Sequence, residues 1–361
     1  MLNGKQLFPE DYPATLKTVV ALDGAMTSRL DLSAKQFDID SGDATIEFLG
    51  LQGTLISDRT FSRSEVDISS PGARVAESGN EVLNVGQMSL KSNARRGVEG
   101  LMLGSGELQL EHIRANETGS GQLFDIEEIA LSATSHAEGQ QVAASMTTQL
   151  KSVKAAGREY GRSELTFSMG NLYAPVLLKI QEALNEIRSQ NIDPQMQGVA
   201  VMSTLVTQAP LLLKHDPKLA IDRLYVETPE GPIDDALTVQ AKGMTWDDLQ
   251  GGFGFLQKLV ADATLSLPET LFKQLSALQV ERQITRQVEM RQRLDEEFTP
   301  PGPVELKRMI DRASEQQLTA LLAQKLLVRE GKQLASKAQF DKGKLTVNGN
   351  LLDLPFLPPP Q

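Results

Sequence analysis

The chain has 361 residues, with 36 lysines and arginines against 47 aspartates and glutamates, which gives a formal net charge of −11. This acidic balance disfavours nucleic-acid binding, because nucleic-acid binders neutralise phosphates with clustered cations. Cysteine is absent, which excludes thiol nucleophiles, disulfide bonds, thiolate zinc sites and cysteine-ligated iron–sulfur clusters. The apolar share of 40% is ordinary for a folded protein.

Residues 1–171 are predicted to form a strand-rich antiparallel β region. Leu30 and Leu32 fall on one side of an extended segment and Arg29 and Asp31 on the other, because successive strand side chains point to opposite faces. Parallel strands buried on both faces would instead read as continuous apolar runs. The alternating runs, separated by clusters of Gly, Asp, Asn and Ser, include Thr18–Leu22, Ser28–Leu32, Ala44–Leu49, Gly53–Ile56 and Ser64–Ile68.

Residues 172–361 are predicted to form an α+β region. Apolar residues recur at intervals of three and four, which is typical of amphipathic helices. Ser266 and Glu269 have capping-box spacing, and Pro268 suits an early helical position. Helices are predicted near 172–190, 194–214, 267–298 and 303–328, and strands near 218–242 and 334–352. The fold class is therefore predicted as α+β, an extensive antiparallel β-sheet with a few amphipathic helices packed on it.

Two similar β-rich halves are a further option for this fold. Ser28–Leu32 resembles Ser163–Phe167, and Gly170-Asn171-Leu172 recurs as Gly349-Asn350-Leu351. Sequence similarities of this length also arise because strands and turns favour the same residue types.

Residues suited to catalysis or metal binding are few. The three histidines, His112, His136 and His215, are scattered, and none has a second histidine at metal-ligand spacing. Hydrolase and phosphate-loop motifs are absent from the sequence. Gly100, Gly104 and Gly106 precede a strand-like segment, which favours a loop or bulge over a dinucleotide-binding turn.

The acidic clusters are better explained by turns and solvated carboxylates. Asp38-Ile39-Asp40-Ser41-Gly42-Asp43 begins like a calcium loop, but glycine stands at its fifth position and Leu49 at its twelfth. Neighbouring carboxylates in a strand, such as Asp234 and Asp235, project to opposite faces, and Asp247-Asp248 fixes no catalytic separation either. Gly251-Gly252-Phe253-Gly254-Phe255, near Trp246, is interpreted as a turn packed on the core, with a mobile apolar edge as the alternative. No catalytic, cofactor-binding or metal-binding residue is assigned, and no cofactor is expected.

The second half of the chain resembles the YdgA-like family of Gram-negative bacterial envelope proteins. The resemblance lies in the order of its helices and strands and in Ala338–Gly349, AQFDKGKLTVNG. It implies a periplasmic protein anchored to the inner membrane in its full-length form, and it supplies no catalytic or ligand residues. Because no run of eighteen or more apolar residues occurs, membrane association is expected only through a segment absent from this chain.

The sequence favours a non-enzymatic envelope scaffold or interaction protein, with a homo-oligomer or another envelope protein as partner. One alternative is a binder or carrier of a lipid or other apolar ligand in a concave β-sheet. Another is a hydrolase with a dispersed site. Nucleic acid is not expected as a partner.

Overall fold

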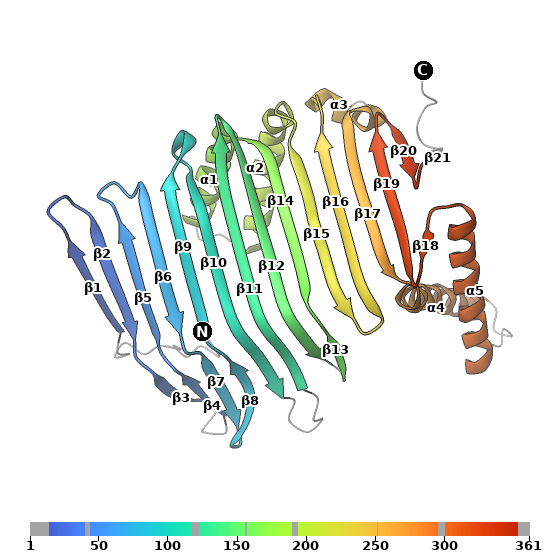
Figure 1. Ribbon diagram of the computed structural model, residues 1–361, viewed down its shortest axis with the longest axis horizontal. Coiled ribbons are helices and arrows are strands. Elements are labelled where there is room, and N and C mark those ends of the chain that lie inside the picture. Colours follow the sequence, from blue (N-terminus) through green and yellow to red (C-terminus); the bar gives the residue numbers. More distant parts are fainter. Residues whose placement is uncertain are drawn as a thin grey trace.

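A computed structural model describes residues 14–39, 44–116, 123–155, 157–189, 194–250, 252–294 and 300–352. The described strands form one 21-stranded sheet in which the pairs are antiparallel (Figure 1). Helices gather at the two ends of its strands, so the predicted α+β class with an extensive antiparallel sheet is confirmed.

The strands of the first half and centre are β1 Ala14–Val20, β2 Met26–Leu32, β3 Lys35–Ile39, β4 Ala44–Phe48, β5 Leu51–Ser57, β6 Arg63–Ser70, β7 Ala73–Glu77, β8 Asn80–Val85, β9 Met88–Arg96, β10 Met102–Asn116, β11 Leu123–Glu138, β12 Gln141–Ala155, β13 Arg158–Tyr160 and β14 Ser163–Tyr173. The later strands are β15 Lys218–Thr228, β16 Gly231–Ala241, β17 Leu259–Pro268, β18 Val328–Glu330, β19 Gln333–Asp341, β20 Lys344–Val347 and β21 Asn350–Leu352.

The sheet is a meander, in which strands close in the chain lie side by side. The strands β2, β5, β6 and β9 pair in that order, and their continuations β3, β4, β7 and β8 pair in the same order beyond a bend. From β10 onward the pairing proceeds through β11, β12, β14, β15, β16, β17 and β19. Most strands therefore pair with partners close in the chain, which favours rapid pairing, whereas the β14–β15 and β17–β19 pairs close over the long helical segments.

The bend between the two rows of strands depends on glycine. Gly50 and Gly72 have φ values of 104° and 119°, which side chains with a Cβ rarely adopt. A Cβ on Gly72 would stand 2.1 Å from the carbonyl oxygen of Val85. The Ser70 hydroxyl donates a hydrogen bond of 2.6 Å to the Gly50 carbonyl. The bend thus requires glycine for both backbone conformation and space.

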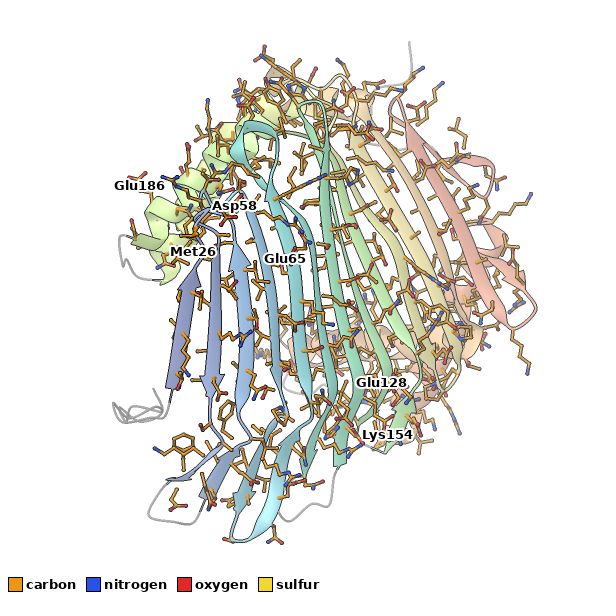
Figure 2. The ribbon with its side chains drawn as sticks, turned by 60° about the vertical axis from the view of Figure 1, so that its left-hand side comes forward. Met26, Asp58, Glu65, Glu128, Lys154 and Glu186 are labelled. Atoms are coloured by element: carbon orange, nitrogen blue, oxygen red, sulfur yellow. The ribbon has the colours of Figure 1, made fainter. Side chains whose placement is uncertain are left out.

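The described helices are α1 Ala174–Ser189, α2 Pro194–Leu213, α3 Trp246–Gln250, α4 Glu269–Leu294 and α5 Pro303–Ala323, with short 3-10 helices η2 Val98–Gly100 and η3 Gly252–Lys258. The pair α1 and α2 connects β14 to β15, and α3 with η3 connects β16 to β17 at the same end of the sheet (Figure 1). The pair α4 and α5 lies at the opposite end. In Figure 1 and in the turned view of Figure 2, α1 and α2 lie on the far side of the sheet.

Two small clusters of buried apolar residues join these helices to the sheet. One consists of Leu101, Leu103, Val142 and Ala174, where α1 begins. The other consists of Leu267, Leu318, Leu327 and Leu334, beneath α5. Most of the remaining sheet is a single layer, because the described helices pack mainly against β14, β17 and β19.

The predicted helices and strands largely match the structure, and the clearest difference lies at the start of α4. Ser266 and Pro268 belong to β17, a strand that the sequence patterns did not predict, and the helix begins at Glu269. The backbone N–H of Ser266 donates to Asp235 in β16, so the predicted capping box does not form. Pairing with Ala335 and Gln333 of β19 fixes Ser266 and Pro268 in an extended conformation. The division into 1–171 and 172–361 stays a prediction, and β14 and β15 pair across it.

An ion-pair network that fixes the start of α4 makes stability depend on pH. Arg329 donates hydrogen bonds of 2.7 and 3.1 Å to Glu269, and Lys273 lies 3.2 Å away. Hydrogen bonding from Arg329, reinforced by Lys273, lowers the pKa of Glu269 below its ordinary value. A lowered pKa stabilises the fold above the unfolded-state pKa, and this contribution disappears as the pH falls through the folded-state pKa.

We expect Glu269→Gln to lower the free energy of unfolding by about 0.5–1 kcal/mol at neutral pH. The variant and the parent should converge in stability at pH values below the folded-state pKa of Glu269. Urea unfolding across the pH range measures this, with Glu305→Gln, at an exposed glutamate in the first turn of α5, as the control. An equal deficit at acidic and neutral pH would contradict the role of this carboxylate.

Candidate functional site

The two faces of the sheet differ in chemistry. Direct cross-strand partners share a face, and one row of such partners is polar from strand to strand. It runs through Arg29, Thr54, Asp67, Lys91, Glu107, Ser132, Thr147 and Thr166. The neighbouring positions form an apolar row through Ile68, Leu90, Leu108 and Leu131. The names polar face and apolar face refer to these two sides.

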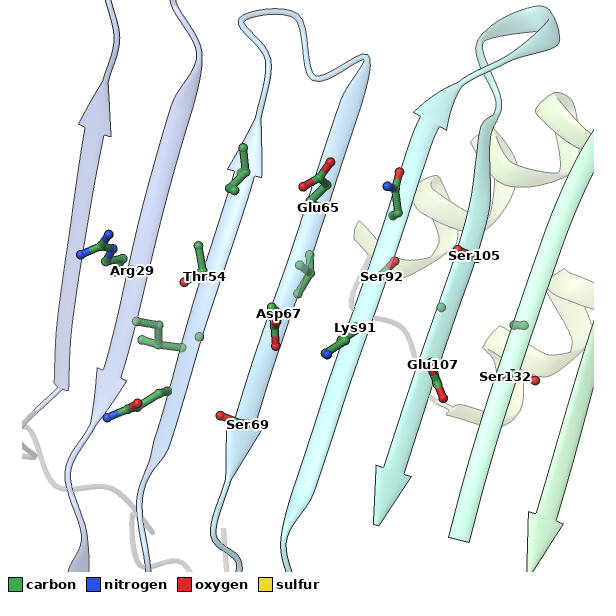
Figure 3. A pocket seen from close by; sticks show the side chains of 18 of the residues that line it. Arg29, Thr54, Glu65, Asp67, Ser69, Lys91, Ser92, Ser105, Glu107 and Ser132 are labelled. Carbon is green, nitrogen blue, oxygen red and sulfur yellow. The ribbon is translucent and has the colours of Figure 1, made fainter.

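The polar face carries a shallow groove of about 910 Å³ across β2, β5, β6, β9, β10 and β11. Figure 3 shows Arg29, Thr54, Asp67, Lys91 and Glu107 on successive strands along it. Charges of opposite sign thus follow one another across the groove, with hydroxyl side chains between them. Such a surface remains hydrated without a partner, because every group on it reaches water.

The apolar face is only partly covered. A sheet that belongs to a two-layer domain buries its apolar face against another element. Here several large apolar side chains of the central strands remain about two-fifths exposed, namely Leu55 at 40%, Met146 at 46%, Leu165 at 39% and Leu237 at 40%. Single exposed apolar residues are common on soluble proteins, whereas a contiguous apolar patch marks a binding site.

One part of the apolar face is hollowed. The apolar hollow has a volume of about 440 Å³. Its floor consists of the small residues Ser92, Ala94, Gly104, Gly106, Ala133 and Ala144, and its walls include Met102, Met146, Phe167 and Met169. Ser92, Gly106, Ala133, Met146 and Phe167 are successive cross-strand partners on β9, β10, β11, β12 and β14. The depression exists because small side chains line one row of the sheet while larger ones surround it.

The apolar hollow continues toward α1. A second depression of about 340 Å³ lies between the start of β10 and α1, where Leu177, Ile180 and Leu184 line it. Met102 and Ser135 line both depressions. The two therefore form one apolar path from the centre of the sheet to the helical end.

The three histidines lie on separate elements. His112 in β10 is hydrogen-bonded to Asn84 at 3.0 Å, and His215, after α2, stacks on Tyr173 with ring centroids 4.0 Å apart. His136 lies in β11, where it pairs with Ala143. In the part of the chain that the structure describes, no three His, Cys, Asp or Glu residues are grouped to hold a metal ion.

The neighbouring aspartates also have separate local roles. Asp234 forms an ion pair with Arg223 at 3.2 Å, whereas Asp235 accepts the backbone N–H of Ser266. Burial raises the pKa of Asp235. Asp248 accepts both the backbone N–H and the hydroxyl of Thr245, which lower its pKa. Residues 40–43 of the calcium-like segment lie outside the described residues.

Two glycine-rich segments differ from their predicted roles. Gly104 and Gly106 lie inside β10 rather than in a loop, and Gly106 belongs to the floor of the apolar hollow. Phe253, expected on the core, lies in η3 and is 54% exposed. The apolar hollow was not predicted, because its floor depends on the register in which the successive strands β9, β10, β11 and β12 pair. The signal available was the glycine at alternate positions of an otherwise regular strand.

Helix α2 is unusually apolar over its whole length. The window Met196–Leu213 in α2 is long and apolar enough to cross a membrane by length and composition, and none of it is buried.

Comparison with known proteins identifies a family but no individual relative. No curated protein and no solved structure matches the chain. The family described as "Bacterial protein of unknown function (DUF945)" matches residues 5–355. The match covers nearly the whole chain, so the chain belongs to this bacterial family.

Proposed function

We propose that the protein is a non-enzymatic binder of lipid acyl chains, which it holds in the apolar hollow. The observation that carries this proposal is an uncovered apolar depression with small residues on its floor and methionine and phenylalanine on its walls. Transfer of an alkyl chain from water to such a surface is favourable in proportion to the apolar area covered. The sequence favours a scaffold over a lipid binder, whereas the apolar hollow supports the lipid binder.

The side chains of the apolar hollow suit a flexible apolar ligand. Met102, Met146 and Met169 are unbranched and polarizable, so they adapt to chains of different shape. The lining contains no charged residue, and the polar groups present are those of serine, threonine and asparagine. The volume of about 440 Å³ lies within the usual range of small-molecule sites. The second depression, toward α1, provides space for the remainder of a longer acyl chain.

The cellular location is proposed on the resemblance alone. A YdgA-like envelope protein implies a periplasmic position with an inner-membrane anchor in the full-length form. Membership of a bacterial family of unknown function is compatible with that location. Acyl chains are abundant at such a site, because phospholipids and lipoproteins border the periplasm.

A second candidate function is that of a scaffold that associates through the sheet edge. Strand β1 pairs with β2, and Leu16, Val19 and Val20 are 68%, 68% and 61% exposed. An edge strand with exposed apolar side chains can add a strand from another chain. Val19→Lys would disrupt such pairing, so a smaller sedimentation coefficient for this variant than for the parent would support the scaffold function.

Photo-crosslinking with a diazirine-bearing palmitate tests acyl-chain binding. We expect crosslinks on peptides that contain Met102, Met146 and Met169. Met146→Glu should weaken palmitate binding about tenfold or more, because a carboxylate would be desolvated by the chain. Met309→Glu, on α5, is the matched control, since Met309 is 43% exposed against 46% for Met146.

Three results would contradict the proposal. They are crosslinks confined to other elements, equal palmitate binding by the two glutamate variants, and purified protein that neither carries lipid nor takes up palmitate. Thermal unfolding of both variants establishes that they are folded.

A further inference from the structure

Helix α2 is an uncharged helix on the surface of an acidic protein. Its sequence, PQMQGVAVMSTLVTQAPLLL, has no Asp, Glu, Lys or Arg in 20 residues. Met196, Val199, Met202 and Val206, which follow one another at three- and four-residue intervals, are 61%, 65%, 60% and 52% exposed. The spacing places these four side chains on one face of the helix. This exposed face therefore carries large apolar side chains, with the hydroxyls of Ser203 and Thr207 among them and no charge.

The polar side chains of α2 are partly satisfied within the helix. The hydroxyl of Thr204 donates to the carbonyl of Ala200 at 3.0 Å, and that of Thr207 donates to the carbonyl of Ser203 at 2.8 Å. A hydroxyl that is hydrogen-bonded within the helix loses little free energy on transfer from water to an apolar medium, because its donor is already satisfied. A typical protein interface would instead offer some charged or polar groups at its rim for a partner to pair with.

The other long helices lack these properties. Helix α1, which packs against α2, carries exposed charges at Lys179, Glu182 and Glu186. Helix α4 carries charged residues along its whole length and lies at the opposite end of the sheet. The uncharged surface is thus confined to one helix at one end of the molecule.

Aromatic and basic residues adjoin α2 in the arrangement typical of a membrane interface. Helix α3 packs against α2. Besides the acidic Asp247 and Asp248, it carries Trp246 and Leu249, the latter 41% exposed. Phe253 follows in η3 and is 54% exposed. Lys214 is exposed directly after the last residue of α2. Tryptophan and phenylalanine favour the boundary between headgroups and acyl chains, and lysine reaches from there to the phosphates.

We propose that the exposed face of α2, together with Trp246, Leu249 and Phe253 beside it, inserts into the surface of a lipid bilayer. Met196, Val199, Met202 and Val206 enter the boundary of the acyl region, while the charged face of α1 stays in water. This contact is an interfacial one, with α2 parallel to the membrane plane. It differs from the expectation that membrane association needs a segment outside this chain. It does not depend on what occupies the apolar hollow.

Vesicle flotation tests this contact with the full chain and vesicles of pure phosphatidylcholine. We expect the parent to float with the vesicles, and Met202→Glu and Val206→Glu each to reduce binding about tenfold or more. Met290→Glu on α4 is the matched control, because Met290 is 59% exposed against 60% for Met202 and the charge change is the same. This control should bind like the parent.

Trp246 provides a second readout, because it is the single tryptophan of the chain. Its emission should shift to shorter wavelength on vesicle addition, and brominated phosphatidylcholine should quench it in the parent and in Met290→Glu but much less in Met202→Glu. Circular dichroism confirms that each variant is folded.

Four outcomes would overturn the proposal. They are no flotation of the parent, flotation only with vesicles that contain phosphatidylglycerol, equal loss in Met202→Glu and Met290→Glu, and an assembly of copies that Met202→Glu dissolves without any vesicle binding by the parent. Loss of palmitate binding with vesicle binding intact would leave this contact standing and remove only the function proposed for the apolar hollow.

Discussion

Replacing Gly106 with leucine is expected to abolish acyl-chain binding while it stabilises the ligand-free protein. Gly106 lies in β10 on the floor of the apolar hollow. A Cβ there would meet only the Lys91 carbonyl oxygen at 3.8 Å and the Ser92 hydroxyl at 3.9 Å, which are ordinary contacts. A leucine side chain therefore fits without moving the backbone, and it fills the space that the alkyl chain would use.

The stabilisation has its own physical cause. Glycine inside a strand costs about 0.5–1 kcal/mol relative to alanine, because the unfolded chain loses more conformational freedom. Leucine would recover part of this free energy and cover apolar surface of Met146 and Phe167 in addition. We expect a higher midpoint of thermal unfolding together with palmitate binding below detection by fluorescence titration.

Gly170→Leu serves as the control for this substitution. Gly170 lies in β14, and a Cβ on it would have nothing within 4 Å. It is not among the residues that line the apolar hollow, so palmitate binding should persist. Undiminished binding by Gly106→Leu would show that the acyl chain lies elsewhere, and lower stability of that variant would show that the space above Gly106 is not free.

Alternation of side chains was sufficient to predict the sheet, and periodicity to predict the long helices. Leu30 and Leu32 share one face and Arg29 the other, as the pattern of Ser28–Leu32 indicates. The predicted helix at 303–328 corresponds to α5, which ends at Ala323. These features depend on neighbours in the chain, which is why a sequence read alone reveals them.

Features that depend on distant residues could not be predicted in this way. Gly104 and Gly106 look alike in the sequence, yet a Cβ on Gly104 would stand 1.9 Å from the carbonyl oxygen of Asn93, whereas Gly106 has room. The extended conformation of Ser266 follows from its pairing with β19 and from the bond of its backbone N–H to Asp235, which override a local helix-start pattern. The apolar hollow likewise needs residues of β9, β10, β11, β12 and β14 side by side. The hollow results from the register in which these strands pair, and no single segment of the sequence specifies that register.

Replacing Leu318 with alanine is expected to produce the largest loss of stability of the substitutions considered. Leu318 in α5 is 1% exposed and belongs to a cluster with Leu267, Leu327 and Leu334. Removing its side chain loses apolar burial and leaves a cavity, at a cost of about 2–5 kcal/mol in the free energy of unfolding. Urea unfolding measures this, and Leu278→Ala on α4, where the side chain is 53% exposed, should cost far less.

The same variant separates stability from ligand binding. The cluster around Leu318 lies beneath α5, whereas the apolar hollow is built on β9 to β14 at a distance along the sheet (Figure 1). At a temperature where Leu318→Ala is folded, palmitate binding should equal that of the parent, because no residue of the hollow has moved. A parallel loss of binding and stability would mean that the meander transmits strain from one end to the other. A cost below 1 kcal/mol, roughly the scale of a surface substitution, would mean that α5 does not close a core at all.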